Sequence, residues 1–100
     1  MITHVVLFKL KDRSPMSIEK ARDILLGLKG KISQLRYLEV GADVLHSERS
    51  YDIALITKFD SMEGLQDYQV HPVHVEVAKY IMSEKESAIA VDFESNKEGR

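Results

Sequence analysis

The first predicted strand is apolar on both of its faces, and this limits what the chain can fold into. Residues 3–10 read THVVLFKL. Successive side chains of a strand point to opposite faces, so one face carries Thr3, Val5, Leu7 and Lys9 and the other carries His4, Val6, Phe8 and Leu10. Strands of this kind are covered on both sides, so we expect a layer packed against each face of the sheet.

A long amphipathic helix is predicted after this strand. The segment KDRSP ends the strand, and Ser14 or Ser17 can cap the helix. Apolar residues then recur at spacings of three and four, which predicts a helix that runs to about residue 35: Ile18, Ala21, Leu25, Leu28, Ile32 and Leu35. Gly27 and Gly30 lie within it, each at a cost of about 1 kcal/mol relative to alanine, and we interpret them as sites of close helix packing.

The remaining chain predicts two strands, a broken helix and a last strand. Residues 37–45 and 51–59 form the strands, joined by the polar HSERS. Asp60 or Ser61 caps the next helix, with Glu63 placed to close a capping box on Asp60. That helix is interrupted at Pro72 and resumes to about residue 83, and residues 87–93 form the last strand. We expect one domain over 1–95 and a charged, flexible tail at 96–100.

This order of elements predicts an α+β fold of the ferredoxin-like βαββαβ type. Its antiparallel four-stranded sheet carries both helices on one face. We expect the other face to be apolar, with side chains from several strands: Val5, Leu7, Val40, Ala88 and Ala90. A patch above a few hundred Å² seldom stays exposed. A second copy packed face to face would cover it, so we predict a homodimer that forms a dimeric α/β barrel.

Composition excludes several classes of function. Fourteen basic and sixteen acidic residues give a formal charge of −2, which offers no electrostatic reason to expect nucleic acid or an anionic membrane as a partner. There is no cysteine, so disulfides, thiolate metal sites and cysteine nucleophiles are excluded. No apolar run is long enough for a membrane span, and the first residues lack the pattern of a signal peptide. We therefore expect a cytoplasmic protein.

The segment LQDYQVHPVHVEV, residues 65–77, gathers the side chains most suited to chemistry. Tyr68 is followed by His71, Pro72 and His74. Proline suits the first position of a helix and disfavours helical geometry in the residue before it, so His71 ends one helical segment and His74 begins the next. A metal pair on one helix needs an unbroken helix, and no third ligand lies nearby. We therefore predict no metal here.

An acid–base pair is the alternative use of this segment. A phenol can donate a proton, and an imidazole titrates near neutral pH, so Tyr68 and His74 in an apolar pocket could polarise a carbonyl and remove a proton beside it. His4 lies on the strand face turned toward the helices and could line the same pocket. Each also has a structural interpretation, as a core ring, a helix-start histidine or a strand-end histidine. His46 lies in a polar turn and is interpreted as a surface residue.

The chain resembles the stress-responsive A/B barrel domain (Dabb) family. The matching parts are THVVLFKLKD, LEVGAD, YDIALITKF and FDSMEGLQDYQVHPVHVEV, within residues 2–94. The resemblance implies a ferredoxin-like protomer and a homodimer with facing sheets. One branch of the family is a polyketide cyclase whose working pair corresponds to Tyr68 and His74, with His4 in the pocket wall. This chain departs from that branch at Ile53, where the cyclase has a histidine.

The resemblance also implies a pocket between the sheet and the helices. The first helix lacks the aromatic side chains of the cyclase pocket and offers Ile24, Leu25 and Leu28 instead. We expect the catalytic pair Tyr68 and His74 to share this pocket with a set of ligand-binding residues: His4, Val6, Phe8, Leu25, Leu28, Ile53, Leu55 and His71. No cofactor is expected.

Three functions are compatible with these residues. The first is a homodimer with a small apolar ligand pocket and unassigned activity. The second is a cofactor-free polyketide cyclase or aldolase-like enzyme that uses the Tyr–His pair on a carbonyl-containing ligand. The third is a non-catalytic stress-protective protein. A haem-degrading barrel would need a tryptophan, which the chain lacks, and an RNA-recognition module would need basic and aromatic residues on its third strand.

Overall fold

The computed structural model describes residues 1–95 and contains seven elements. They follow in the order β1 (Ile2–Leu10), α1 (Pro15–Leu26), β2 (Tyr37–Ala42), β3 (Ile53–Phe59), α2 (Met62–Val70), α3 (Pro72–Glu84) and β4 (Lys85–Glu94). The helix that was predicted to break at Pro72 is thus two helices. The tail predicted at 96–100 lies outside the described residues.

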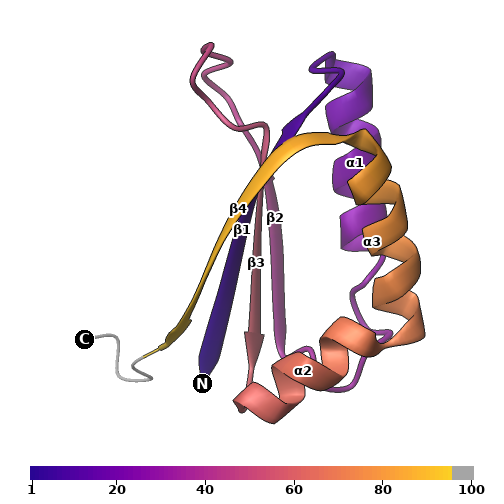
Figure 1. Ribbon diagram of the computed structural model, residues 1–100, viewed down its shortest axis with the longest axis vertical. Helices are drawn as coiled ribbons and strands as arrows, with labels where there is room; N and C mark the ends of the chain where they lie inside the picture. Colours follow the sequence, from indigo (N-terminus) through magenta and orange to yellow (C-terminus); the bar gives the residue numbers. More distant parts are fainter. Residues whose placement is uncertain (96–100) are drawn as a thin grey trace.

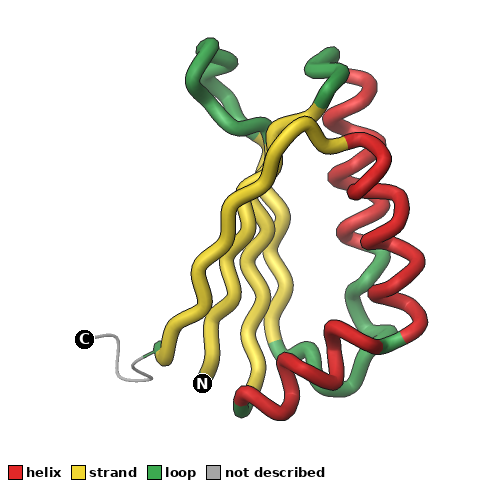
Figure 2. Tube along the Cα trace, viewed as in Figure 1, coloured by secondary structure: helices red, strands yellow, loops and turns green. Residues whose placement is uncertain are grey.

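The strands form one antiparallel sheet in the order β2-β3-β1-β4. Figure 1 shows the three helices gathered on one side of this sheet, and Figure 2 shows the same two layers by element type. The predicted ferredoxin-like α+β fold is confirmed. β1 and β3 lie in the middle of the sheet, so the first strand has neighbours on both edges as well as a helical layer on one face.

Three residues expected on the outer face of the sheet lie on the helix face instead. Val40, Ala88 and Ala90 stand opposite residues that point toward the helices: Leu55, Phe8 and Val6 respectively. Opposite residues of an antiparallel pair share a face, so the prediction for these three was wrong. A shift of one residue moves a whole strand's side chains to the other face, and the sequence did not fix which residues of each strand face out.

The outer face is nevertheless apolar across β1 and β4. Val5 and Leu7 lie in a shallow depression with side chains of the last strand, and the neighbouring β4 residues are largely exposed: Ile89, Val91 and Phe93. Val91 is 54% exposed. A single protomer therefore leaves an apolar sheet surface uncovered.

The first helix is shorter than its apolar pattern predicts. It begins at the expected cap, where the Ser14 hydroxyl accepts a hydrogen bond from the Ser17 backbone N–H at 3.3 Å. It ends at Leu26 instead of about residue 35, and the chain continues in turns joined by backbone bonds between residues three apart. Gly27 is the C-cap residue of α1, and within the turns Gly30 takes a left-handed conformation with φ of 77°, which glycine adopts without steric cost.

Burial explains why the apolar pattern continues beyond the end of this helix. Leu28 and Ile32 are buried in the cluster that includes Leu65 and Tyr68 of α2, although neither is in α1. The spacing of three and four between apolar residues therefore indicates which side chains are buried. It does not indicate how far the helix extends.

The core lies between the sheet and the helical layer in two adjoining clusters. One joins α1 and the end of α3 to the middle of the sheet through residues such as Val6, Phe8 and Leu25. The other surrounds α2 and contains Phe59 and Tyr68. The candidate tyrosine is therefore part of the packed interior.

A buried carboxylate fixes the long turn between β2 and β3. The second strand ends at Ala42 rather than at residue 45, and the turn that follows returns to Asp52, which is 1% exposed. The Asp52 carboxylate accepts hydrogen bonds from the Leu10 backbone N–H at 2.8 Å and from Arg13 Nε at 3.0 Å. Arg13 Nη2 also donates to the carbonyl oxygens of Ser47 and Ser50. The pair ties the turn to the end of β1.

The cap of α2 was predicted to be Asp60 or Ser61, and it is Ser61. The Ser61 hydroxyl accepts from the Gly64 backbone N–H at 3.2 Å and caps α2. Asp60 does not serve as the cap. Its carboxylate accepts a hydrogen bond from Arg36 Nε at 2.9 Å, which ties the start of β2 to the end of β3.

Within residues 1–95, no helix is long and apolar enough to cross a membrane. The cytoplasmic location expected from the sequence stays a prediction.

The Asp52 pair gives a test of this fold. We expect Asp52→Ala to lower the free energy of unfolding by about 3 kcal/mol, because it leaves a guanidinium and a buried N–H without their partner. Urea denaturation at neutral pH measures this. The control is Asp60→Ala, whose exposed pair with Arg36 should contribute less than about 1 kcal/mol. Equal losses in the two variants would contradict the structural role given to Asp52.

Candidate functional site

The break between α2 and α3 determines where the candidate side chains lie. Pro72 occupies the first position of α3, and His71 is extended with φ −65° and ψ 136°. The His71 backbone N–H still closes α2 on the Tyr68 carbonyl at 3.1 Å. Its ring Nδ1 accepts from the Val73 backbone N–H at 3.1 Å and caps α3. The helix axis changes direction at this point (Figure 1).

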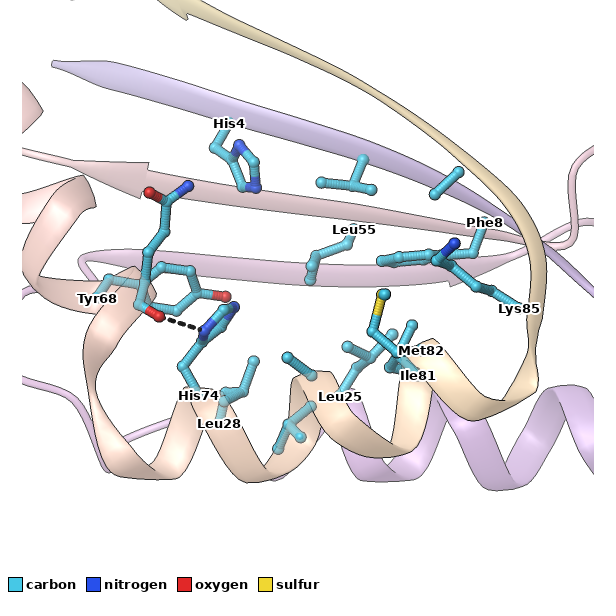
Figure 3. Close-up of a pocket in the computed structure, with 15 residues that line it drawn as sticks. His4, Phe8, Leu25, Leu28, Leu55, Tyr68, His74, Ile81, Met82 and Lys85 are labelled. Atoms are coloured by element: carbon cyan, nitrogen blue, oxygen red, sulfur yellow. Dashed lines mark hydrogen bonds between the residues drawn. The ribbon is translucent and has the colours of Figure 1, made fainter.

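The bend brings Tyr68 and His74 together. Six residues apart on a straight helix, they would not share one face closely. Their ring centroids lie 4.4 Å apart with the planes tilted by 49°. Figure 3 shows both rings at one end of a pocket, with His4 across from them on β1. The convergence expected from the sequence is present; the roles of these residues stay proposals.

The pocket is a cavity of about 250 Å³ between the sheet and α3. Most of the residues expected to bind a ligand line it together with Tyr68 and His74: His4, Val6, Phe8, Leu25, Leu28 and Leu55. Two do not. Ile53 is packed in the core on the helix face of β3, and His71 is used as a helix cap.

Tyr68 presents a buried phenol to the pocket. The residue is 1% exposed and its ring packs on Phe59 at a centroid distance of 4.8 Å. Its hydroxyl is buried and has no hydrogen-bond partner among residues 1–95. Burial raises the pKa of Tyr68 to about 12, so the phenol keeps its proton. A buried hydroxyl without a partner is costly, and this one can donate to a ligand.

His74 is held in a defined orientation by the end of α2. Its Nδ1 lies 3.1 Å from the Gln69 carbonyl oxygen, drawn as the dashed line in Figure 3. A carbonyl oxygen only accepts, so Nδ1 carries the proton, and the neutral ring has its lone pair on Nε2.

The environment of His74 also favours its neutral form. Burial lowers the pKa of His74 below its ordinary value of 6.5, the bond to the Gln69 carbonyl opposes this, and positive charge on His4 or His71 lowers it further. The imidazole is therefore a free base at neutral pH.

His4 is oriented by an acidic partner that the sequence reading missed. His4 on β1 stands opposite Asp92 on β4, and its Nδ1 is hydrogen-bonded to the Asp92 carboxylate. This contact leaves Nε2 of His4 for the pocket. Asp92 lies between apolar residues of the last strand, Val91 and Phe93, and the strand register would have been needed to find it.

The other missed lining residues come mainly from α3. Counted from His74, they follow at intervals of three, four, seven, eight and eleven residues: Val77, Ala78, Ile81, Met82 and Lys85. These intervals define one face of a helix. The signal was present in the sequence, since any residue on the His74 face of this helix points toward the same space.

No metal cluster is found at this site or elsewhere in residues 1–95, where no three His, Asp or Glu side chains come together in a suitable arrangement. Nδ1 of His71 and of His74 each bonds to the backbone. The absence of a metal and of a cofactor stays a prediction. What the described residues offer chemically is a protonated phenol beside a neutral imidazole in an apolar cavity.

Proteins with a similar sequence include an uncharacterised protein and a stress-response protein. An uncharacterised protein of Streptomyces coelicolor is 32% identical over 77 residues, which cover 74% of this chain and 79% of that protein. The stress-response A/B barrel domain-containing protein DABB1 of Arabidopsis thaliana is 29% identical over 98 residues. That match covers 93% of this chain but 46% of DABB1, so the chain spans about half the length of this relative.

Two similar solved structures are described as dimeric. A dimeric ferredoxin-like protein of unknown function from Bacteroides fragilis superimposes with a TM-score of 0.81 at 34% identity, over 94% of this chain and 95% of that one. A dimeric ferredoxin-like protein of unknown function from Thermobifida fusca gives a TM-score of 0.83 at 29% identity, over 94% and 90%.

The family model for the stress responsive A/B barrel domain matches residues 2–95. The match spans every element of the fold and the whole of the Tyr68–His74 segment. The resemblance read from the sequence is thereby confirmed, and this chain belongs to the stress-responsive A/B barrel domain (Dabb) family.

Proposed function

We propose that this protein binds a small, largely apolar carbonyl compound and moves a proton at the carbon beside the carbonyl. The observation that carries the proposal is the Tyr68 hydroxyl, buried without a partner among the described residues, next to the His74 ring. A group in this situation gains a hydrogen bond when a carbonyl oxygen enters the pocket, so it favours ligands of that class.

The two side chains have separate roles in this proposal. Tyr68 donates to the carbonyl oxygen, and Nε2 of His74 takes the proton from the adjacent carbon. The electron pair of the broken C–H bond moves into the carbonyl, which gives an enol or enolate held by the Tyr68 hydroxyl. Return of a proton from His74 completes an exchange, and attack of the enolate on a second carbonyl would give aldol or cyclase chemistry.

Positioning supports this assignment of roles. The Gln69 carbonyl fixes the His74 tautomer that has its lone pair on Nε2, and Asp92 orients His4 across the pocket. An apolar lining lowers the local dielectric constant, which strengthens a hydrogen bond to the substrate. Polyketide cyclase-like chemistry, aldolase-like chemistry and non-catalytic ligand binding would each use this pocket. The exchange experiment below distinguishes catalysis from binding alone.

We further propose that the protein is a homodimer joined through the outer face of the sheet. Two solved neighbours are described as dimeric, and the outer face of this protomer is apolar over β1 and β4. A specific interface of this kind would bury at least about 1,000 Å² in total. The predicted dimeric barrel is the assembly that covers both sides of β1.

Proton exchange gives a test that needs no knowledge of the natural substrate. In deuterated buffer we expect the wild-type protein to speed deuterium incorporation beside the carbonyl of an apolar ketone such as 2-decanone, followed by NMR. Tyr68→Phe and His74→Ala should each lower this rate by about 10²–10⁴, the usual effect of an acid or base. Tyr80→Phe is the control, since Tyr80 lies on α3 outside the pocket lining. Folded variants with wild-type rates would show that the pair only packs.

The acid–base roles also predict a pH dependence. The pKa of His74 is lowered from 6.5 and that of Tyr68 is raised to about 12. The base form of His74 is lost only as pH falls through its lowered pKa, so the exchange rate should drop at a pH below 6.5. Between neutral pH and about pH 10 the exchange rate should stay level, because the phenol of Tyr68 keeps its proton there. A rate that keeps rising between about pH 8 and 10 would instead indicate a phenolate base.

The homodimer is tested by one charge on the outer face. We expect wild-type protein to sediment as a dimer at micromolar concentration and Val91→Glu to sediment as a folded monomer, because the carboxylate would be buried unpaired at the interface. Val44→Glu is the matched control, since Val44 is 91% exposed in the β2–β3 turn. Monomeric wild-type protein would rule out the proposed assembly.

A further inference from the structure

The pocket has polar groups at two ends and apolar side chains between them. His4, Tyr68, Gln69 and His74 form one end. Lys85 lies at the other end, at the junction of α3 and β4 (Figure 3). Every remaining lining residue in the described chain is apolar, from Leu28 and Val77 near the histidines to Phe8 and Met82 near the lysine.

Lys85 is the one permanently charged side chain among the described residues that line this pocket. Three other lysines have polar partners: Lys79 pairs with Glu76, Lys9 donates to the Glu48 carbonyl and Lys11 donates to the Ser83 carbonyl. The amine of Lys85 makes no ion pair and no hydrogen bond within residues 1–95. It is half-buried, and Figure 3 shows its chain reaching over Phe8 at the pocket end.

A favourable interaction with the end of α3 is the ordinary reason for a lysine at this position. Lys11 Nζ donates to the Ser83 carbonyl at 3.3 Å, so a cation other than Lys85 already lies at the last turn of α3. An ammonium group beside an apolar cavity interacts well with an anionic group that enters the cavity.

We infer that the pocket takes an elongated molecule with a carbonyl at the Tyr68–His74 end, an apolar chain in the middle and a carboxylate at the Lys85 end. This inference rests on the proposed function for the placement of the carbonyl, but the role of Lys85 in binding does not depend on catalysis. It narrows the substrate class from apolar carbonyl compounds to keto acids and related acyl chains.

The dimensions of the pocket fit such a molecule. α3 continues from His74 to Glu84, a helical rise of about 15 Å at 1.5 Å per residue, and Lys85 follows directly as the first residue of β4. Both side chains lean into the cavity and shorten this span. An acyl chain of medium length therefore connects the two ends, whereas a compact ring would reach only one of them.

Binding measurements with matched probes test the inference. The probes are 9-oxodecanoate, which has a ketone near one end and a carboxylate at the other, and 2-decanone, which lacks the carboxylate. We expect wild-type protein to bind the keto acid about tenfold more tightly at low salt, by calorimetry or NMR titration. The preference should fall as salt is added, because the ion pair is partly exposed.

The variants assign this preference to one amine. Lys85→Met keeps an unbranched apolar side chain without the charge and should abolish the preference, while Lys85→Arg should retain it. Lys31→Met, a change at an exposed lysine outside the pocket, should leave it intact. A preference that is absent in wild-type protein, or unchanged in Lys85→Met, overturns the inference. Should Lys85→Met fail to fold, a salt-insensitive preference in wild-type and Lys85→Arg protein would overturn it instead.

The exchange assay separates this inference from the proposed function. If the keto acid is preferred through Lys85 but no variant or wild-type protein exchanges the ketone protons, the anion site stands and the acid–base proposal falls. If exchange depends on Tyr68 and His74 while Lys85→Met keeps the preference, the acid–base proposal stands and the anion site falls.

Discussion

The missing N–H of Pro72 determines how the site is built. A proline inside a continuous helix would lose a backbone bond and clash with the preceding turn, so α2 must stop and α3 must start afresh at this residue. Restarting the helix turns its axis and brings His74 back over Tyr68, at a centroid distance of 4.4 Å. The same break releases the Gln69 carbonyl from the helical pattern, and that carbonyl then fixes the His74 ring. One imino acid thus sets the position, orientation and tautomer of the candidate base.

Burial keeps both rings uncharged, so that Tyr68 can donate a proton and His74 can accept one. An apolar environment disfavours the charged form of any group, so it keeps the phenol of Tyr68 protonated and the imidazole of His74 neutral. The pair therefore consists of one donor and one acceptor. Lys85 stands at the far end of the cavity, where a charge can hold a ligand without altering the protonation of this pair.

The sequence was sufficient for the fold and for part of the site, and the reasons differ by element. Pro72, the caps and the two-sided first strand act locally, so the helix break and the order of elements could be read directly. The extent of α1 could not, because Leu28 and Ile32 keep a helical spacing while they pack from a series of turns. Asp92 and the facing of Ala88 and Ala90 depend on how β4 is aligned with β1, and that register is a long-range property.

The last strand connects the pocket to the proposed interface. β4 supplies Ala88 and the partner of His4, Asp92, to the helix face, while Val91 and Phe93 point to the outer face. Alternate residues of one strand therefore serve two different surfaces. Covering the outer face would hold β4 against β1 along its length and so keep Asp92 on His4. Ligand binding on one side of the sheet and assembly on the other are thus expected to depend on the same strand.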